Sequence, residues 1–369
     1  MTRHPPMSLR VRQHGFTIVE LMVGMLLALM TTVIIAAVLT RAEGTRRSTT
    51  EGSDAQVNGA LSLYALQRDI QMAGYGVVNS LTAESLGCTI QGGLLSAAVT
   101  NGLVPALINR TATGNNSDTL EVLRSGADNY AVPLLTSAVH ATGDTRFHVQ
   151  SRLGVQTGDL MMAIPESGST SACQLFTVKD DGTWATDTTG VPHATDSAWN
   201  TSAAISAIPT YTTGSTLIRV AGLVWTTYQW DASSNALVLR DRLTGTTTTV
   251  GNNIVLFKAY YGKDASGTGN VNAYDQTTPT TASGWKAVRT IRVMVVARSS
   301  QREKTAVTTA NPTVDVGTAT TMSGTSTCGT SKCLTLQISP TSGTDTEWQH
   351  YRYKVFDTVV PLRNILWSS

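Results

Sequence analysis

The chain has 369 residues and carries 27 Lys and Arg against 25 Asp and Glu, which leaves a formal net charge of +2. A chain this close to neutral shows no basic patch of the kind that holds nucleic acid, so we expect no nucleic-acid partner. No G-x-S-x-G, H-E-x-x-H or P-loop motif occurs, and no His lies near a Ser or Cys in a nucleophile pattern. We therefore expect neither enzymatic activity nor a cofactor.

The first 40 residues combine a basic leader with a long apolar segment. Residues 1–15 contain three arginines and no acidic residue, and the 25 residues from Phe16 to Thr40 contain one charged side chain, Glu20. At about 1.5 Å per residue, such a helix spans a bilayer with some tilt. We predict a membrane-spanning helix over residues 16–40 whose solvent is the lipid bilayer.

Glu20 is the most informative residue of this segment. A carboxylate inside lipid costs roughly 2.5–3.5 kcal/mol on insertion scales, so it needs a partner or a purpose. The plainer interpretation is an acidic residue near the interface that stabilises the start of the helix. Basic residues do not settle the orientation, because three precede the apolar segment and three follow it within seven residues, at 41, 46 and 47.

The leader, Gly15, Phe16 and Glu20 together resemble the signal of type IV prepilins and of type II secretion pseudopilins. The resemblance implies that a prepilin peptidase removes residues 1–15 after Gly15 and that the new amino group of Phe16 is methylated. It implies that Glu20 pairs with the terminal ammonium of a neighbouring subunit during assembly. It also implies a single pass through the inner membrane with the carboxyl-terminal part in the periplasm.

Four cysteines, an even number, suit an oxidising compartment. Cys328 and Cys333 enclose four residues, which favours a local disulfide and leaves Cys88 and Cys173 for a second one, although four cysteines allow three connectivities. A zinc site would want two C-x-x-C pairs or nearby histidines, and no His lies within fifteen residues of the 328/333 pair. We expect disulfides and no metal.

Residues 41–75 continue the helical pattern as an amphipathic helix. Leu63, Leu66, Ile70 and Ala73 recur at spacings of three and four with polar residues between them, which predicts a helix that lies on a core. A single helix from residue 16 to about 73 is compatible with the sequence. Glycines at 24, 44, 52 and 59 are the places where it could bend.

Residues 76–369 are predicted to form a head rich in antiparallel β-sheet. Period-two segments rich in branched and aromatic residues predict strands at 119–124, 237–240, 254–261 and 288–298. Three arginines interrupt the last of these, at 289, 292 and 298, and we interpret them as its solvated face.

Two stretches of the head stand apart from the strand pattern. Residues 305–346 are rich in threonine and carry the Cys328/Cys333 pair, which predicts an insertion held by its own disulfide. Residues 264–272 alternate oxygen-bearing side chains as a calcium loop does, but Asp264 is the only carboxylate and no distal Glu follows. A flexible hairpin loop is the preferred interpretation.

Five segments of the chain resemble PilW-type minor pilins. Residues 66–76 resemble their RDI..AGY segment and residues 117–122 their first exposed strand, and residues 251–264, 285–299 and 351–364 resemble later parts of the same family. The insertion at 305–346 has no counterpart there. We interpret residues 361–364 as the end of a strand and not as a ligand site.

The resemblance implies an α+β, type IV pilin-like fold, with a long amino-terminal helix packed on the β-rich head. It implies a minor pilin that takes part in type IV pilus assembly, in a priming complex near the fibre tip, and that enters the extracellular pilus. Its expected partners are the prepilin peptidase, other minor pilins, the major pilin and the inner-membrane assembly platform. A minor pseudopilin of a type II secretion system is the first alternative, and a stand-alone membrane-anchored adhesin is the second.

Overall fold

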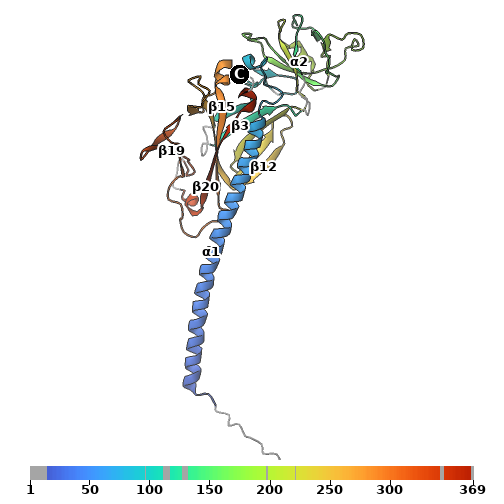
Figure 1. Cartoon of the computed structure of the whole chain (residues 1–369). Coiled ribbons are helices and arrows are strands. Elements are labelled where there is room, and N and C mark those ends of the chain that lie inside the picture. Colours follow the sequence, from blue (N-terminus) through green and yellow to red (C-terminus); the bar gives the residue numbers. More distant parts are fainter. Residues whose placement is uncertain are drawn as a thin grey trace, which may run out of the picture. The chain divides into compact units, whose positions relative to one another are not determined.

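The computed structural model describes residues 15–366 apart from 96, 111–116, 127–131, 197, 221 and 341–344, and the side-chain surroundings of 45 and 47–51 are not described. Residues 1–14 of the expected leader therefore lie outside the described residues. The chain divides into two compact units, residues 1–53 and residues 54–369. Helix α1 (Ile18–Met72) contributes to both units, and the named strands belong to the second, which we call the β-rich unit (Figure 1). The expected α+β class, with an apolar amino-terminal helix and mostly antiparallel sheets, is confirmed.

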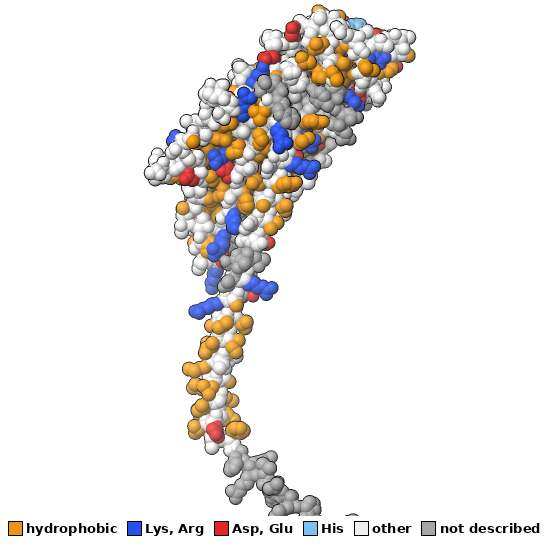
Figure 2. Space-filling view, in the orientation of Figure 1, with side chains coloured by type: hydrophobic (Ala, Val, Ile, Leu, Met, Phe, Trp, Pro, Cys, Tyr) orange, Lys and Arg blue, Asp and Glu red, His pale blue; other side chains and the backbone are white. Residues whose placement is uncertain are grey.

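In the first unit, α1 carries no charged side chain on any side between Leu21 and Thr40. Figure 2 shows hydrophobic side chains over the visible face of the helix outside the β-rich unit. The threonines that interrupt this surface turn their hydroxyls back onto the helix: Thr31 donates to the carbonyl of Leu27 at 2.9 Å and Thr40 to that of Ala37 at 3.0 Å. Because lipid offers polar groups no partner, such internal bonds let threonine remain in an apolar helix.

In the second unit, α1 has one buried face. Leu66 and Ile70 are fully buried there, as is Ala73 just beyond the helix, and Leu63 packs against the same cluster. The amphipathic pattern read from these residues therefore corresponds to a core-facing stripe. The end of α1 is also held by a polar contact, since the Asn364 side chain donates to the Ala73 carbonyl at 2.8 Å.

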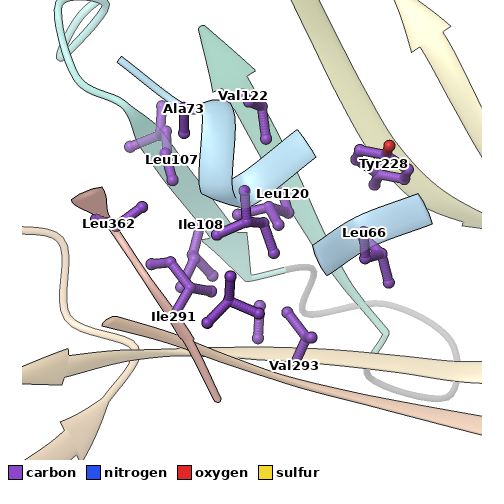
Figure 3. Close-up of a cluster of buried hydrophobic side chains, with 14 of the residues drawn as sticks. Leu66, Ala73, Leu107, Ile108, Leu120, Val122, Tyr228, Ile291, Val293 and Leu362 are labelled. Atoms are coloured by element: carbon purple, nitrogen blue, oxygen red, sulfur yellow. The ribbon is translucent and has the colours of Figure 1, made fainter. Parts of the chain in front are cut away.

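Two five-stranded sheets of described residues enclose the main hydrophobic core with α1. The first has the order β12 (Thr247–Asn252), β11 (Ala236–Asp241), β10 (Val224–Asp231), β3 (Asp118–Arg124), β2 (Ala106–Arg110). The second has the order β17 (Thr321–Met322), β14 (Ala273–Asp275), β13 (Ile254–Lys263), β15 (Val288–Arg298), β20 (Tyr353–Pro361). Figure 3 shows side chains of α1, of both sheets and of the segment after β20 meeting in this core.

Buried polar groups join the two sheets. The hydroxyl of Ser117 accepts the amide of Phe257 at 3.2 Å, and the carboxylate of Asp118 accepts the amide of Ala259 at 3.0 Å and lies 3.2 Å from the Lys258 ammonium. Burial raises the pKa of Asp118, and Lys258 opposes that rise. Residues 118–122 lie in β3, an inner strand of the first sheet: Leu120 and Val122 face the main core, and Thr119 on the other face is half-buried.

The described part of the predicted insertion at 305–346 packs against the outer face of the second sheet. It forms a small sheet with the order β16 (Thr313–Asp315), β19 (Ser331–Thr335), β18 (Thr325–Cys328), and the Cys328–Cys333 disulfide links β18 to β19. Its Met322, Leu334, Leu336 and Ile338 are buried together with Met294 of β15. Hydrophobic contacts therefore hold the insertion in addition to its disulfide.

This covering corrects the interpretation of the arginines of β15. Arg292 does not lie on a solvated face: its side chain is 11% exposed and forms a bidentate ion pair with Asp357 of β20, with Tyr274 beneath the guanidinium. Arg298 lies over the ring of Tyr351 at 4.3 Å. The second face of β15 is covered because distant segments of the chain pack onto it.

A third group of strands forms a separate lobe of the β-rich unit. One sheet has the order β1 (Ile90–Gln91), β7 (Cys173–Thr177), β6 (Leu160–Ile164), β9 (Thr216–Arg219), β4 (Leu134–Leu135), and a ribbon pairs β5 (Arg146–His148) with β8 (Gly190–Pro192). The Cys88–Cys173 disulfide ties this lobe to the segment that follows α1. Short helices complete the described chain: η1 (Ala83–Ser85), α2 (Ser202–Ser206), α3 (Ala282–Lys286), η2 (Glu347–His350) and α4 (Arg363–Leu366).

Two buried histidines lie at the centre of this lobe. The Nε2 atoms of His140 and His193 are 2.9 Å apart, so one ring donates its proton to the lone pair of the other. Phe147 stacks on His140 with ring centroids 4.0 Å apart, and Phe176 and Tyr211 complete an aromatic surround. Burial, and then the neighbouring His140, lower the pKa of His193 to about 4, and burial lowers the pKa of His140 as well.

Gly59 lets α1 approach the second sheet closely. A Cβ atom at this position would lie 2.0 Å from the Phe356 ring, whereas nothing lies within 4 Å of a Cβ at Gly44. We predict that Gly59→Ala lowers the free energy of unfolding by about 1–3 kcal/mol through overpacking, despite alanine's better helix propensity. Gly44→Ala, the control, should be neutral or slightly stabilising. Denaturant unfolding measures the free energy of unfolding of both variants. Equal changes in the two would contradict the close approach of α1 to Phe356. So would a Gly59→Ala cost that stays the same when Phe356 is replaced by Leu.

The histidine pair predicts acid sensitivity of the lobe. A folded-state pKa of about 4 for His193 lies below the unfolded value of about 6.5, so its contribution to stability is complete above pH 6.5 and is lost as the pH falls toward 4. We expect this group to account for about 2–3 kcal/mol of the loss. His193→Gln should flatten the pH dependence of unfolding between pH 7 and 4.5, and the exposed His148→Gln should not. Identical profiles for the two variants would contradict this assignment.

Candidate assembly surface

The amino-terminal end of the described chain is non-helical and accessible. Residues 15–17 precede α1 without helical structure, a Cβ atom at Gly15 would meet no heavy atom within 4 Å, and the Phe16 side chain is 88% exposed. A peptide bond in such a segment can enter a peptidase without unwinding a helix. The Gly15–Phe16 bond therefore lies outside the helix.

Thr17 and Glu20 form a capping box at the start of α1. The Thr17 amide and hydroxyl both donate to Oε2 of Glu20, at 3.1 and 3.0 Å, and the Glu20 amide donates to the Thr17 hydroxyl at 3.2 Å. These bonds satisfy backbone groups that a helix start leaves without partners. In the isolated chain, Glu20 therefore acts as an acidic residue that caps the start of the helix, which is the plainer of its two interpretations.

The cap leaves the carboxylate able to bind a second partner. Both bonds from Thr17 go to Oε2. A carboxylate has about four lone-pair positions, so Oε1 can still accept a charged donor. A helix cap and a docking point for an ammonium group are compatible roles for one glutamate. Thr17 was not singled out in the sequence, although the T-x-x-E spacing that signals a capping box is present.

Among the described helices, one segment of α1 has the length and composition to cross a membrane. It covers Ile18–Gly44, 27 residues with a mean hydropathy of 2.6. Arg41 and Glu43 lie at its carboxyl-terminal end, where charged side chains reach the polar side of a bilayer. This part of the chain is consistent with membrane anchoring.

Beyond this segment, α1 carries a second apolar stripe that the rest of the β-rich unit does not cover. Val57, Leu61 and Tyr64 are more than half exposed, and their spacings of four and three place them on one side of the helix. The core-facing residues Leu66 and Ile70 lie on another side. In the β-rich unit, α1 therefore has one apolar stripe in the core and another on the surface.

The other residues considered from the sequence have structural roles. The carboxylate of Asp264 accepts the amides of Thr268 at 3.0 Å and Gly269 at 2.7 Å and closes the 264–272 loop on itself. Burial alone would raise the pKa of Asp264, but these amide bonds outweigh it and the pKa lies below its usual value. Strand β20 ends at Pro361 as expected, and Asn364 in the following turn holds the end of α1.

Similarity to a known protein family is found in the carboxyl-terminal part of the β-rich unit. Residues 225–364 match the family model of type IV pilus-assembly protein W. This segment begins in β10 and ends in α4, and it includes the second sheet and the insertion. The chain shows no significant match to a curated protein or to a solved structure. The family match supports the resemblance to PilW proteins and, with it, involvement in type IV pilus assembly.

Proposed function

We propose that this protein is a minor pilin whose α1 anchors it in the inner membrane and packs against other subunits while a type IV pilus is primed. One observation carries this proposal: the same chain has an apolar amino-terminal helix, preceded by Gly15-Phe16, and a segment at 225–364 that resembles PilW. The priming complex, the position near the fibre tip and entry into the extracellular pilus are parts of the same proposal.

Three features of the structure support it. The capped carboxylate of Glu20 retains Oε1 for the terminal ammonium of a neighbour. The surface stripe of Val57, Leu61 and Tyr64 offers apolar contacts at the spacing used in helix–helix packing. The two disulfides suit the periplasm, where the β-rich unit of such a subunit would lie. A type II secretion pseudopilin would share the helix, but the family match favours the pilus.

The proposed partners follow from these surfaces. The non-helical residues 15–17 fit a prepilin peptidase, which would remove residues 1–15 and methylate Phe16. The apolar helix fits the helices of other minor pilins and the major pilin. Contact with the inner-membrane assembly platform would be made from the membrane segment. Residues 76–369, with the insertion, then form the periplasmic head on an amphipathic segment at 41–75.

Processing is the first test. We predict that mass spectrometry of the membrane-extracted protein finds a chain that begins at a methylated Phe16. Gly15→Arg should leave the precursor uncut, because a large side chain would occupy the space that glycine leaves for the peptidase. Gly24→Ala, in the helix, should be processed normally. A mature chain that begins at Met1 in cells with an active prepilin peptidase would overturn the proposed maturation.

The second test separates the charge of Glu20 from its cap. Glu20→Gln keeps an N3 residue able to complete the capping box but removes the charge, whereas Thr17→Ala keeps the charge and removes the cap at a cost of about 1 kcal/mol. If the carboxylate docks a neighbouring ammonium, Glu20→Gln should enter the pilus poorly and Thr17→Ala nearly normally. Cysteine cross-linking of neighbouring helices and counts of surface pili measure this. Normal assembly of Glu20→Gln would remove the docking role.

A further inference from the structure

An open groove of about 600 Å³ lies on the outer face of the first sheet. None of the described residues that line it belongs to α1. Its floor is polar. The strand register pairs Thr227 of β10 with Glu121 of β3 on one side and with Arg240 of β11 on the other, and Gln229 lies further along β10. An antiparallel sheet with one face in water has a polar face, so the floor alone does not indicate a ligand. The arrangement of the charged side chains and the aliphatic part of the lining indicate which ligand would fit.

One of the two arginines among the described residues that line the groove is paired with a carboxylate. Glu121 is 9% exposed, and its carboxylate accepts from Arg242 at 3.0 Å and from the Asn109 amide at 3.1 Å. The Cζ atom of Arg242 lies over the ring of Trp225, 5.0 Å from its centroid. Arg242 therefore balances Glu121. Arg240 is exposed and adds the remaining positive charge, which gives the described lining of the groove a net charge of +1.

Part of the lining of the groove is aliphatic. Leu94, which is 48% exposed, Leu95 and Leu243 are among the residues that line it. No aromatic ring is among the described residues that line it, so a sugar ring finds no stacking surface. Aliphatic lining residues beside an exposed guanidinium match an aliphatic side chain next to a carboxylate. Threonine and glutamine side chains on the floor offer hydrogen bonds to peptide groups.

We propose that this groove binds an acidic peptide segment of a partner protein, with a carboxylate on Arg240 and a neighbouring aliphatic side chain against Leu94. The positive charge of Arg240 attracts the carboxylate, and Glu121 does not neutralise that charge because it is paired with Arg242. Peptide binding is measured independently of piliation, so this site can be tested separately from the proposed function.

The test uses the full chain in detergent micelles and a fluorescein-labelled peptide of alternating Glu and Leu, with a matched peptide in which Gln replaces Glu. Fluorescence anisotropy should show tighter binding of the Glu peptide. Arg240→Ala should weaken that binding at least about tenfold, the effect of losing one charge-assisted hydrogen bond. Arg302→Ala, which removes an exposed arginine outside the groove, is the matched control and should leave the affinity unchanged.

A charge reversal makes the test independent of any effect on folding. Arg240→Glu should lose the Glu peptide and gain a peptide with Lys in those positions. Equal affinities for the Glu and Gln peptides, or an unchanged affinity in Arg240→Ala, would overturn the proposal. Binding of oligomeric alginate that depends on Arg240, without binding of the Glu peptide, would also overturn it, because the groove would then be a site for acidic sugars.

Discussion

The structure depends on a single helix, α1, that carries two different kinds of surface. Between Leu21 and Thr40, α1 carries no charged side chain and keeps its threonine hydroxyls bonded to its own backbone, as lipid requires. In the β-rich unit the same helix supplies Leu66 and Ile70 to the main core. The helix is therefore both the candidate anchor and the element around which the sheets pack.

The β-rich unit is fitted to this helix by contacts that are specific in geometry. The Tyr228 hydroxyl donates to Asp69 at 2.6 Å, and Asn364 donates to the end of α1. Ser117 and Asp118 then link the two sheets that share the core. Since each of these polar groups is partly or fully buried, breaking one bond would leave an unpaired group in the interior. The helix, the sheets and the chain end thus form one cooperative core.

Features set by local pattern could be predicted from the sequence, and those set by distant packing could not. The β13 and β15 strands followed from branched and aromatic residues, and the core stripe of α1 followed from its spacing. Arg292 was misread because period-two alternation does not reveal that residues 305–346 cover the second face. The His140–His193 pair joins positions 53 residues apart, which no local pattern indicates. The capping box could have been found, since T-x-x-E is local.

A role of this chain in type IV pilus assembly is tested most directly by deletion of its gene. Surface pili should be counted by electron microscopy in the deletion strain and after restoration of the gene, with type II secretion measured in parallel. We expect a loss of pili that the restored gene repairs, with secretion unchanged. Normal piliation together with lost secretion would contradict this role and would identify the chain as a pseudopilin.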